Sequence, residues 1–152
     1  MGKNLELRKN NMVLVDSSIW IEAFRRQGDL LTSLALENLV EEGKAAYCGI
    51  IKLEVLGGAR ELERKILTNF FSLIPYIPQN EIHWDDTVRF QWICRGAGIT
   101  IPWSDAVIAT HAQKKGLQLY AKDKHFDSLE ELGLLSLYRP GPGGAYVSSL
   151  AV

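Results

Sequence analysis

The chain has 152 residues, of which 47% are apolar and 23% are charged, which is typical of one globular domain large enough to bury its own core. Its 17 basic and 18 acidic residues give a net charge of −1, which excludes a protein that coats nucleic acid through overall positive charge. No apolar run approaches the roughly 18 residues of a membrane span, and residues 1–11 lack the apolar centre of a signal peptide, so no membrane partner is expected.

The chain contains two cysteines, Cys48 and Cys94, which are far apart in sequence. Neither has a second Cys or a His at the spacing of a zinc site, and each lies among apolar residues. Two buried, reduced thiols are therefore expected, and a cytoplasmic location is predicted.

The first element of the chain changes its pattern at Asp16. Residues 12–15 form a continuous apolar run, typical of a strand buried on both faces, and the apolar residues that follow recur at helical spacing. An acid at the carboxyl end of a buried strand lies where open α/β sheets bind their ligands. Asp16 or a following Ser could equally serve only as the N-cap of the helix.

The rest of the chain alternates between patterns typical of helices and of strands. Helices are predicted at residues 30–40, 50–56, 60–71, 81–97, about 103–112 and 128–132, and strands at 45–48, 117–121 and 134–138, with a short extended piece between Pro75 and Pro78. This order predicts an α/β fold with three layers, in which a mostly parallel central sheet of about five strands has helices on both faces. Residues 139–152 include Pro140-Gly-Pro-Gly-Gly144 and are expected to be a flexible C-terminal tail.

Four acidic residues are placed near the carboxyl ends of the predicted strands or at the helix starts that face them. They are Asp16, Glu54, Asp105 and Asp123. Asp105 falls in the first turn of its helix, where the helix dipole favours a carboxylate, and Asp123 follows the strand at 117–121. Because parallel strands bring these ends to one edge of the sheet, the four carboxylates are expected to lie together.

Clustered carboxylates require a compensating charge. Two of them about 4 Å apart repel by roughly 4 kcal/mol in a partly buried site, so four cannot all stay ionised without a cation. Mg²⁺ or Mn²⁺ takes oxygen ligands and suits an all-carboxylate site with no His or Cys at ligand spacing. A plainer interpretation, in which Asp105 only caps a helix and Asp123 only forms a turn, needs four separate coincidences at one edge.

Four segments of the chain together resemble the PIN-domain ribonucleases. They are Val-Asp16-Ser-Ser-Ile-Trp-Ile, Cys-Gly-Ile-Ile-Lys-Leu-Glu54-Val-Leu-Gly-Gly-Ala-Arg, Ser104-Asp105-Ala-Val-Ile-Ala and Tyr-Ala-Lys-Asp123-Lys-His-Phe. The chain length and the segment after Glu54 are most similar to the VapC-type toxins of toxin–antitoxin pairs. The resemblance implies a PIN domain at residues 12–138, preceded by an N-terminal extension at 1–11 and followed by the tail at 139–152.

The resemblance also implies an activity, a cofactor and partners. The activity is that of a metal-dependent endoribonuclease, in which metal-activated water hydrolyses RNA phosphodiester bonds. By position, Asp16, Glu54, Asp105 and Asp123 would hold Mg²⁺ or Mn²⁺, and Ser17 would support the first acid. The implied partners are the RNA substrate, a cognate antitoxin protein and a second copy of the chain in a homodimer. Apolar surface for such contacts is expected at Trp20, Phe24, Leu30, Leu31 and Leu62–Phe71.

Several neighbours of the acids have open roles. The basic residues closest to them are candidates for holding the RNA backbone, although each is more often an ordinary solvated charge; these are Arg25, Arg26, Lys52, Lys122 and Lys124. His125 is interpreted as a residue at the rim of the site. Asp127 is interpreted as the cap of the helix at 128–132.

Two other functions remain as alternatives. Mg²⁺-dependent phosphotransfer and phosphatase domains also place an Asp after their first strand. The phosphatase pattern, however, needs a second Asp two residues later, where this chain has Ser18, and neither pattern needs Glu54 inside a helix. A catalytically inert PIN domain that serves as a binding module is the other alternative, but such a domain would be expected to have lost some of the four acids.

Overall fold

The computed structural model describes residues 11–79 and 82–149. Its elements, in chain order, are β1 (Val13–Val15), α2 (Ser17–Ala23), α3 (Leu30–Glu41), β2 (Ala45–Ala46), α4 (Gly49–Gly57), α5 (Glu61–Leu73), α6 (Ile82–Gly96), α7 (Trp103–Lys115), β3 (Gln118–Tyr120), α8 (His125–Glu131) and the short 3₁₀ helix η1 (Pro142–Gly144). None of the helices in these ranges is long and apolar enough to cross a lipid bilayer.

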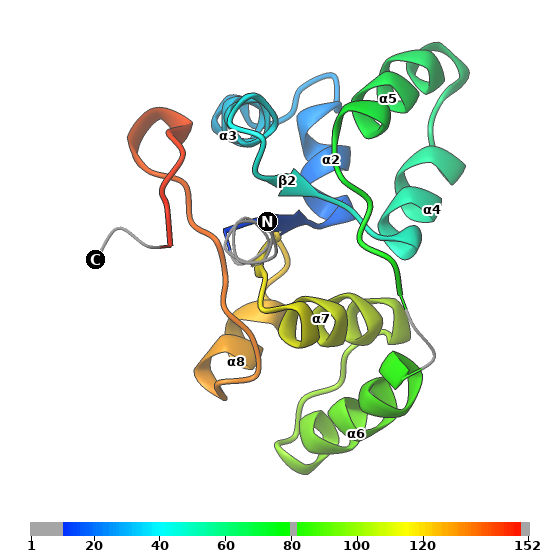
Figure 1. Ribbon diagram of the computed structural model, residues 1–152, viewed down its shortest axis with the longest axis vertical. Helices are drawn as coiled ribbons and strands as arrows, with labels where there is room; N and C mark the ends of the chain where they lie inside the picture. The colour runs from blue at the N-terminus through cyan, green and yellow to red at the C-terminus, as the bar shows by residue number, and fades with distance from the viewer. Residues whose placement is uncertain (1–10, 80–81, 150–152) are drawn as a thin grey trace, which may run out of the picture.

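The three strands form one parallel sheet in the order β2-β1-β3. All three residues of β1 are buried, because this strand has a neighbour on each edge and helices above and below. In Figure 1, α2, α3 and α5 lie on one side of the sheet and α6, α7 and α8 on the other. The predicted α/β fold with a parallel sheet and helices is confirmed.

The predicted number of about five strands is wrong, because the two outer strands are reduced to single bridges in the described residues. Tyr47 bridges Tyr76 beside β2, and Leu119 bridges Leu137 beside β3. At the edge beside β2, the connection between α5, which ends at Leu73, and α6, which begins at Ile82, is short, so few residues can pair as a strand. At the second edge, Tyr138 donates to Leu119, and the next donor in register would be Pro140, which has no N–H.

Helix α7 carries Asp105 and is enclosed by its surroundings. The seven residues from Ala106 to Ala112 are all buried, and many of them are small, which allows the helix to pack closely between the sheet and α6. The helix begins after Pro102 and ends at Gly116, which has a left-handed φ of 64°. Asp105 is therefore fixed in the first turn of a rigid helix, as the sequence predicts.

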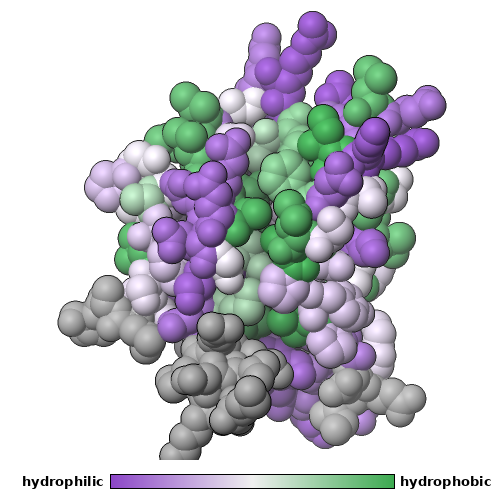
Figure 2. All heavy atoms as spheres, turned by 45° about the horizontal axis from the view of Figure 1, so that its top comes forward, coloured by the Kyte–Doolittle hydropathy of each residue, from purple (hydrophilic) through white to green (hydrophobic). Residues whose placement is uncertain are grey.

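The apolar residues of the early helices are divided between core and surface. Trp20 is completely buried, and its ring stacks on Phe71 with centroids 4.8 Å apart and meets the edge of Phe70 at 6.1 Å. Others remain exposed, among them Leu30, Leu31, Leu62 and Ile66. Figure 2, which turns the end of the molecule with α3 and α5 forward, shows hydrophobic side chains between flanks of hydrophilic ones. The expected apolar surface is thus present, but without Trp20, Leu67 and Phe71, which are buried.

Residues 139–149 run beside α3 (Figure 1). Asn38 donates from Nδ2 to the carbonyl oxygen of Gly144 at 2.8 Å. Gly144 has φ +81°, and a Cβ there would come within 2.9 Å of the backbone nitrogen of Ala35, so only Gly suits this approach. In the structure this segment is therefore packed, although its composition predicts a flexible tail. The domain boundaries stay a prediction, and residues 1–10 of the predicted N-terminal extension lie outside the described residues.

Both cysteines are buried and free, as the sequence predicts. Cys48 lies directly before α4, and Cys94 lies near the end of α6. Burial raises the pKa of both thiols, which keeps them protonated and unreactive.

Candidate metal centre

Asp16 follows β1 and is the N-cap of α2. Its Oδ2 accepts hydrogen bonds from the Ser18 N–H at 3.1 Å and from the Ser18 hydroxyl at 2.5 Å. The residue is only 3% exposed, and its other oxygen, Oδ1, has no hydrogen-bond partner in the described part of the chain. A buried carboxylate oxygen without a partner is costly, so it indicates a ligand that brings positive charge. Asp16 therefore both caps the helix and offers an oxygen to a cation.

Ser18 joins the ends of two strands. Its Oγ donates to Asp16 and accepts a hydrogen bond from the backbone N–H of Lys122 at 3.1 Å. Asp16 follows β1 and Lys122 follows β3, so this hydroxyl links the two loops that carry acidic residues. The contact with Lys122 could not be predicted from the sequence, because the two residues are 104 positions apart.

Glu54 reaches the site from α4. The hydroxyl of Ser17 donates to Oε2 of Glu54 at 3.2 Å, so Ser17 contacts Glu54, whereas the resemblance implied support of Asp16. Burial and the negative charge of Asp16 raise the pKa of Glu54 above its ordinary value. The two consecutive serines at the start of α2 thus each hold one acid of the predicted four.

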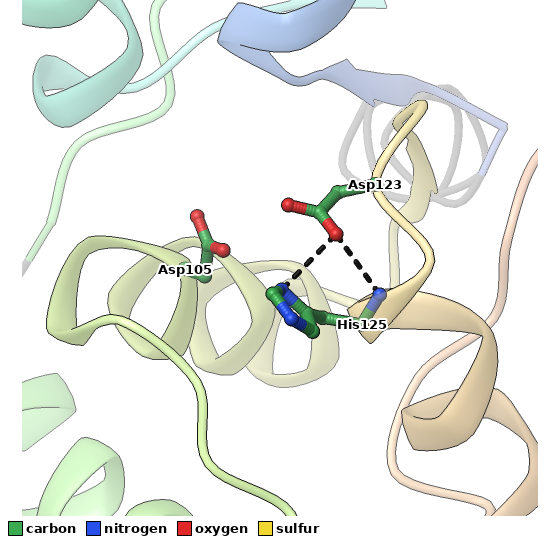
Figure 3. A group of neighbouring side chains, drawn as sticks. All are labelled: Asp105, Asp123 and His125. Carbon is green, nitrogen blue, oxygen red and sulfur yellow. Dashed lines mark hydrogen bonds and ion pairs between the residues drawn. The ribbon is translucent and has the colours of Figure 1, made fainter.

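Asp105, Asp123 and His125 form a compact group, shown in Figure 3. One ligand atom from each of these side chains lies within 4.8 Å of the others, which is close enough to share one metal ion. His125 donates its backbone N–H to Oδ1 of Asp123 at 3.0 Å, and its Nδ1 lies 3.0 Å from the same oxygen. His125, interpreted from the sequence as a rim residue, is therefore part of the cluster itself.

The four acids interact electrostatically. Burial, followed by the charges of Asp16, Asp123 and Glu54, raises the pKa of Asp105 to about 6. Burial, with a smaller effect of Asp123, raises the pKa of Asp16. The structure therefore brings the four predicted residues near enough to interact through their charges, while only Asp105 and Asp123, together with His125, have ligand atoms within 4.8 Å of one another. Their oxygens, including the unpartnered Oδ1 of Asp16, fit a hard divalent cation, which would relieve the repulsion.

The nearby basic residues differ in their contacts. Nζ of Lys122 lies 3.7 Å from Oε1 of Glu22 and 3.7 Å from Oδ2 of Asp29, so this residue ties the end of β3 to the loop between α2 and α3. Arg25 pairs with Glu22 at 3.3 Å. The other three candidates make no ion pair within residues 11–79 and 82–149; they are Arg26, Lys52 and Lys124.

Asp127 does not cap a helix, because α8 begins at His125 with Lys124 at its N-cap. The interpretation of Asp127 as the cap of a helix at 128–132 was therefore wrong. Asp127 lies in the first turn of α8, and its only ion pair in the described residues is with Arg139, at 4.0 Å.

Comparison with known proteins identifies the family. The PIN domain family model matches residues 13–132. "VapC ribonuclease Mb1587" of Mycobacterium bovis is 30% identical over 129 residues, which cover 80% of this chain and 93% of that protein. "Ribonuclease VapC11" of Mycobacterium tuberculosis has the same identity and coverage.

Solved structures share the fold. FitAcB from Neisseria gonorrhoeae has a TM-score of 0.69 at 18% identity and covers 84% of this chain and 97% of its own. VapBC2 from Rickettsia felis, bound to a promoter DNA fragment, has a TM-score of 0.69 at 20% identity with the same coverage. The sequence matches and the similarity of the fold agree, and the chain belongs to the PIN-domain family and, within it, to the VapC ribonucleases.

Proposed function

We propose that this chain is the toxin of a VapBC-type toxin–antitoxin pair and acts as a metal-dependent endoribonuclease that hydrolyses RNA phosphodiester bonds. The observation that carries the proposal is the cluster of four coupled carboxylates, in which the buried Oδ1 of Asp16 has no partner in the described residues. The names of the relatives support RNA as the substrate. A cytoplasmic location and a PIN domain at residues 12–138 belong to the same proposal, and the family match at 13–132 supports these bounds.

The acids Asp16, Glu54, Asp105 and Asp123 would hold Mg²⁺ or Mn²⁺, with His125 beside Asp123. When bound, such an ion supplies an activated water and neutralises phosphate charge. Ser17 and Ser18 keep the carboxylates of Glu54 and Asp16 in place through their hydroxyls. Ser18 also fixes the loop after β3, which positions the segment that carries Asp123.

The phosphatase alternative is not supported at the position that would distinguish it. That pattern needs an acid two residues after Asp16, where the hydroxyl of Ser18 instead bonds Asp16 and the loop after β3. The alternative of an inert binding module gains no support from the site, since all four acids are present and interact.

Chelation tests the function. We expect excess EDTA to abolish the cleavage of RNA by the purified protein and added Mg²⁺ or Mn²⁺ to restore it. The carboxylates are negatively charged and cannot supply the positive charge that the ion brings to the phosphate. Cleavage is measured by gel electrophoresis of RNA. EDTA already saturated with Mg²⁺ controls for effects of the chelator itself. Undiminished cleavage in excess free EDTA would contradict metal dependence.

Two protein partners are part of the proposal. Several of the solved relatives are toxin–antitoxin complexes, which supports a cognate antitoxin for this chain. A homodimer is supported by exposed apolar residues on successive turns of α6, namely Trp84, Val88 and Trp92. This surface is more aromatic than the exposed part of the early helices, from which the sequence predicted the contact and whose exposed large apolar residues are Leu and Ile.

The α6 surface makes a testable dimer contact. We expect the protein to sediment as a dimer at micromolar concentration and Trp92→Arg to shift it to the monomer, because the charge would be buried in the contact. Leu62→Arg, on α5, is the matched control, since Leu62 is 92% exposed and Trp92 is 67% exposed. If the wild type is a monomer, or if only Leu62→Arg dissociates the dimer, α6 does not form the dimer contact.

A further inference from the structure

His125 adds a nitrogen donor to the oxygens of the metal centre. Its Nδ1 is 3.0 Å from Oδ1 of Asp123, and one ligand atom from each of Asp105, Asp123 and His125 lies within 4.8 Å of the others. Figure 3 shows the three side chains converging from α7, from the segment after β3 and from the start of α8. The group is therefore a mixed set of oxygen and nitrogen donors, although the sequence predicts a site made of carboxylates alone.

The spacing of these atoms suits ligands of one ion. An octahedral ion with bonds of about 2.1 Å places adjacent ligands about 3 Å apart. The distance of 3.0 Å between Nδ1 of His125 and Oδ1 of Asp123 matches this spacing, but it also suits a hydrogen bond, which is the competing role of the ring. The buried Oδ1 of Asp16, which has no partner in the described residues, indicates independently that a cation belongs in this cluster.

The two other histidines of the chain lie elsewhere in the fold. The chain contains three histidines in all. His83 on α6 and His111 on α7 are buried, and their Nδ1 atoms lie 3.3 Å from each other. A histidine nitrogen bound to an ion at the acidic cluster would therefore belong to His125.

An imidazole ligand changes which ion a site prefers. Mg²⁺ takes oxygen ligands, whereas Mn²⁺ is a first-row transition ion that also accepts nitrogen. The four acids offer only oxygen, so they do not distinguish between the two ions. A nitrogen from His125 would strengthen the binding of Mn²⁺ and add little to the binding of Mg²⁺.

We propose that His125 binds the metal ion directly through a ring nitrogen, and that the site therefore holds Mn²⁺ in preference to Mg²⁺. This inference rests on the proposed function, because it concerns the ion that the nuclease would use. It gives His125 a role as a ligand in place of the position at the rim that the sequence indicates.

Pulsed electron paramagnetic resonance of bound Mn²⁺ tests the ligand without catalysis. The whole chain, freed of metal, receives one equivalent of Mn²⁺, and electron spin-echo envelope modulation detects the nuclei bound to the ion. We expect ¹⁴N modulation in the wild type, changing to that of ¹⁵N when only histidine is labelled. His125→Asn should lose the signal and stay folded, because the side chain of His125 is half exposed at the start of α8. The matched control is Lys124→Gln, which should keep the signal, since Lys124 makes no side-chain cap hydrogen bond to α8.

The affinities for the two ions test the preference. Calorimetric titration gives the Kd for Mn²⁺ and for Mg²⁺ of each variant. We expect His125→Asn to weaken the binding of Mn²⁺ about 10-fold and that of Mg²⁺ less than about threefold, because its amide oxygen replaces the nitrogen adequately for Mg²⁺ only. A ring that only held Asp123 by a hydrogen bond would affect both ions equally. The change in the ratio of the two affinities is therefore decisive.

The outcomes separate this inference from the proposed function. If the Mn²⁺-loaded wild type shows no histidine coupling, or if His125→Asn weakens both ions equally, the ligand role is overturned, while EDTA-sensitive cleavage of RNA would leave the nuclease standing. Coupling that persists in His125→Asn would belong to another histidine and also overturn it. A wild type that shows the coupling but cleaves no RNA would support the ligand and refute the nuclease.

Discussion

Asp16→Asn is expected to lower the rate of RNA cleavage by more than about 100-fold. Replacing even a residue that only holds a metal ligand in place typically lowers metal affinity or activity by about 10- to 100-fold, and Asp16 is proposed to bind the metal itself. The protein should stay folded, because the amide oxygen of Asn can still accept the two hydrogen bonds from Ser18 that cap α2. Without metal, the variant should be at least as stable as wild type, because one source of carboxylate repulsion is gone. RNA cleavage and thermal unfolding measure the two effects.

Asp127→Asn is the matched control for this change. Asp127 is an exposed acid on α8 whose contact with Arg139 is 4.0 Å long, and it is not among the charges that raise the pKa of Asp105. The same chemical change there should leave cleavage within about twofold of wild type. If Asp16→Asn cleaved as fast as Asp127→Asn, Asp16 would have no part in the reaction.

Acidification is expected to destabilise the contact between α6 and α7 through a pair of histidines. Nδ1 of His111 lies 3.3 Å from Nδ1 of His83, and the residues are 0% and 6% exposed. At this distance one Nδ1 must donate a hydrogen bond and the other must accept it. If both rings become positively charged, both nitrogens carry a proton and the hydrogen bond between them is lost. Burial, His83 and Lys115 lower the pKa of His111 to about 4.

The sign follows from the two states of His111. Its pKa is about 4 in the folded protein and near 6.5 in the unfolded chain, so the unfolded chain binds more protons between these values. The contribution of His111 to the free energy of unfolding is therefore largest above pH 6.5 and should fall by about 3 kcal/mol as the pH drops to about 4. His83 acts in the same direction, because burial and the charges of Lys115 and Lys114 lower its pKa despite the opposing Asp86.

Urea unfolding of metal-free protein at pH 7 and pH 4.5 measures this loss. Asp105 must be removed from the comparison, because its raised pKa of about 6 has the opposite sign and its contribution is lost as the pH rises. The reference is therefore Asp105→Asn, and the test variant adds His111→Gln. The loss between the two pH values should be clearly smaller in the double variant. An equal loss in both would exclude His111 as the source.

Three of the four acids, Asp16, Asp105 and Asp123, could be placed from the sequence because each lies where one local pattern gives way to another, whereas Glu54 lies inside α4. Asp16 follows an apolar strand, and Asp105 lies just after the Pro that begins α7. Short-range patterns therefore placed the acids, and the topology of a parallel sheet brought them together. Their placement near the strand ends and helix starts could therefore be predicted without knowledge of distant contacts.

The contacts that hold the acids could not be predicted in this way. The hydroxyl of Ser18 depends on Lys122, which is close only after the sheet has formed, and His125 joins the cluster because α8 begins earlier than its apolar pattern indicates. The width of the sheet was overestimated for a similar reason. An apolar run at residues 134–138 indicates an extended segment, but its pairing depends on where donors meet acceptors and on Pro140.

The central position of β1 has a consequence for the order in which the molecule is made. Residues 13–15 of β1 pair with residues 118–120 of β3. The strand β1 therefore leaves the ribosome long before β3, and its second edge stays unpaired until β3 has been made. Asp123 and His125 follow that late strand directly. A nascent chain therefore holds an incomplete acid cluster until these residues have been made, at a time when it is surrounded by RNA. The proposed nuclease would become competent only after β3 has paired with β1, which leaves an antitoxin time to be present before the site is complete.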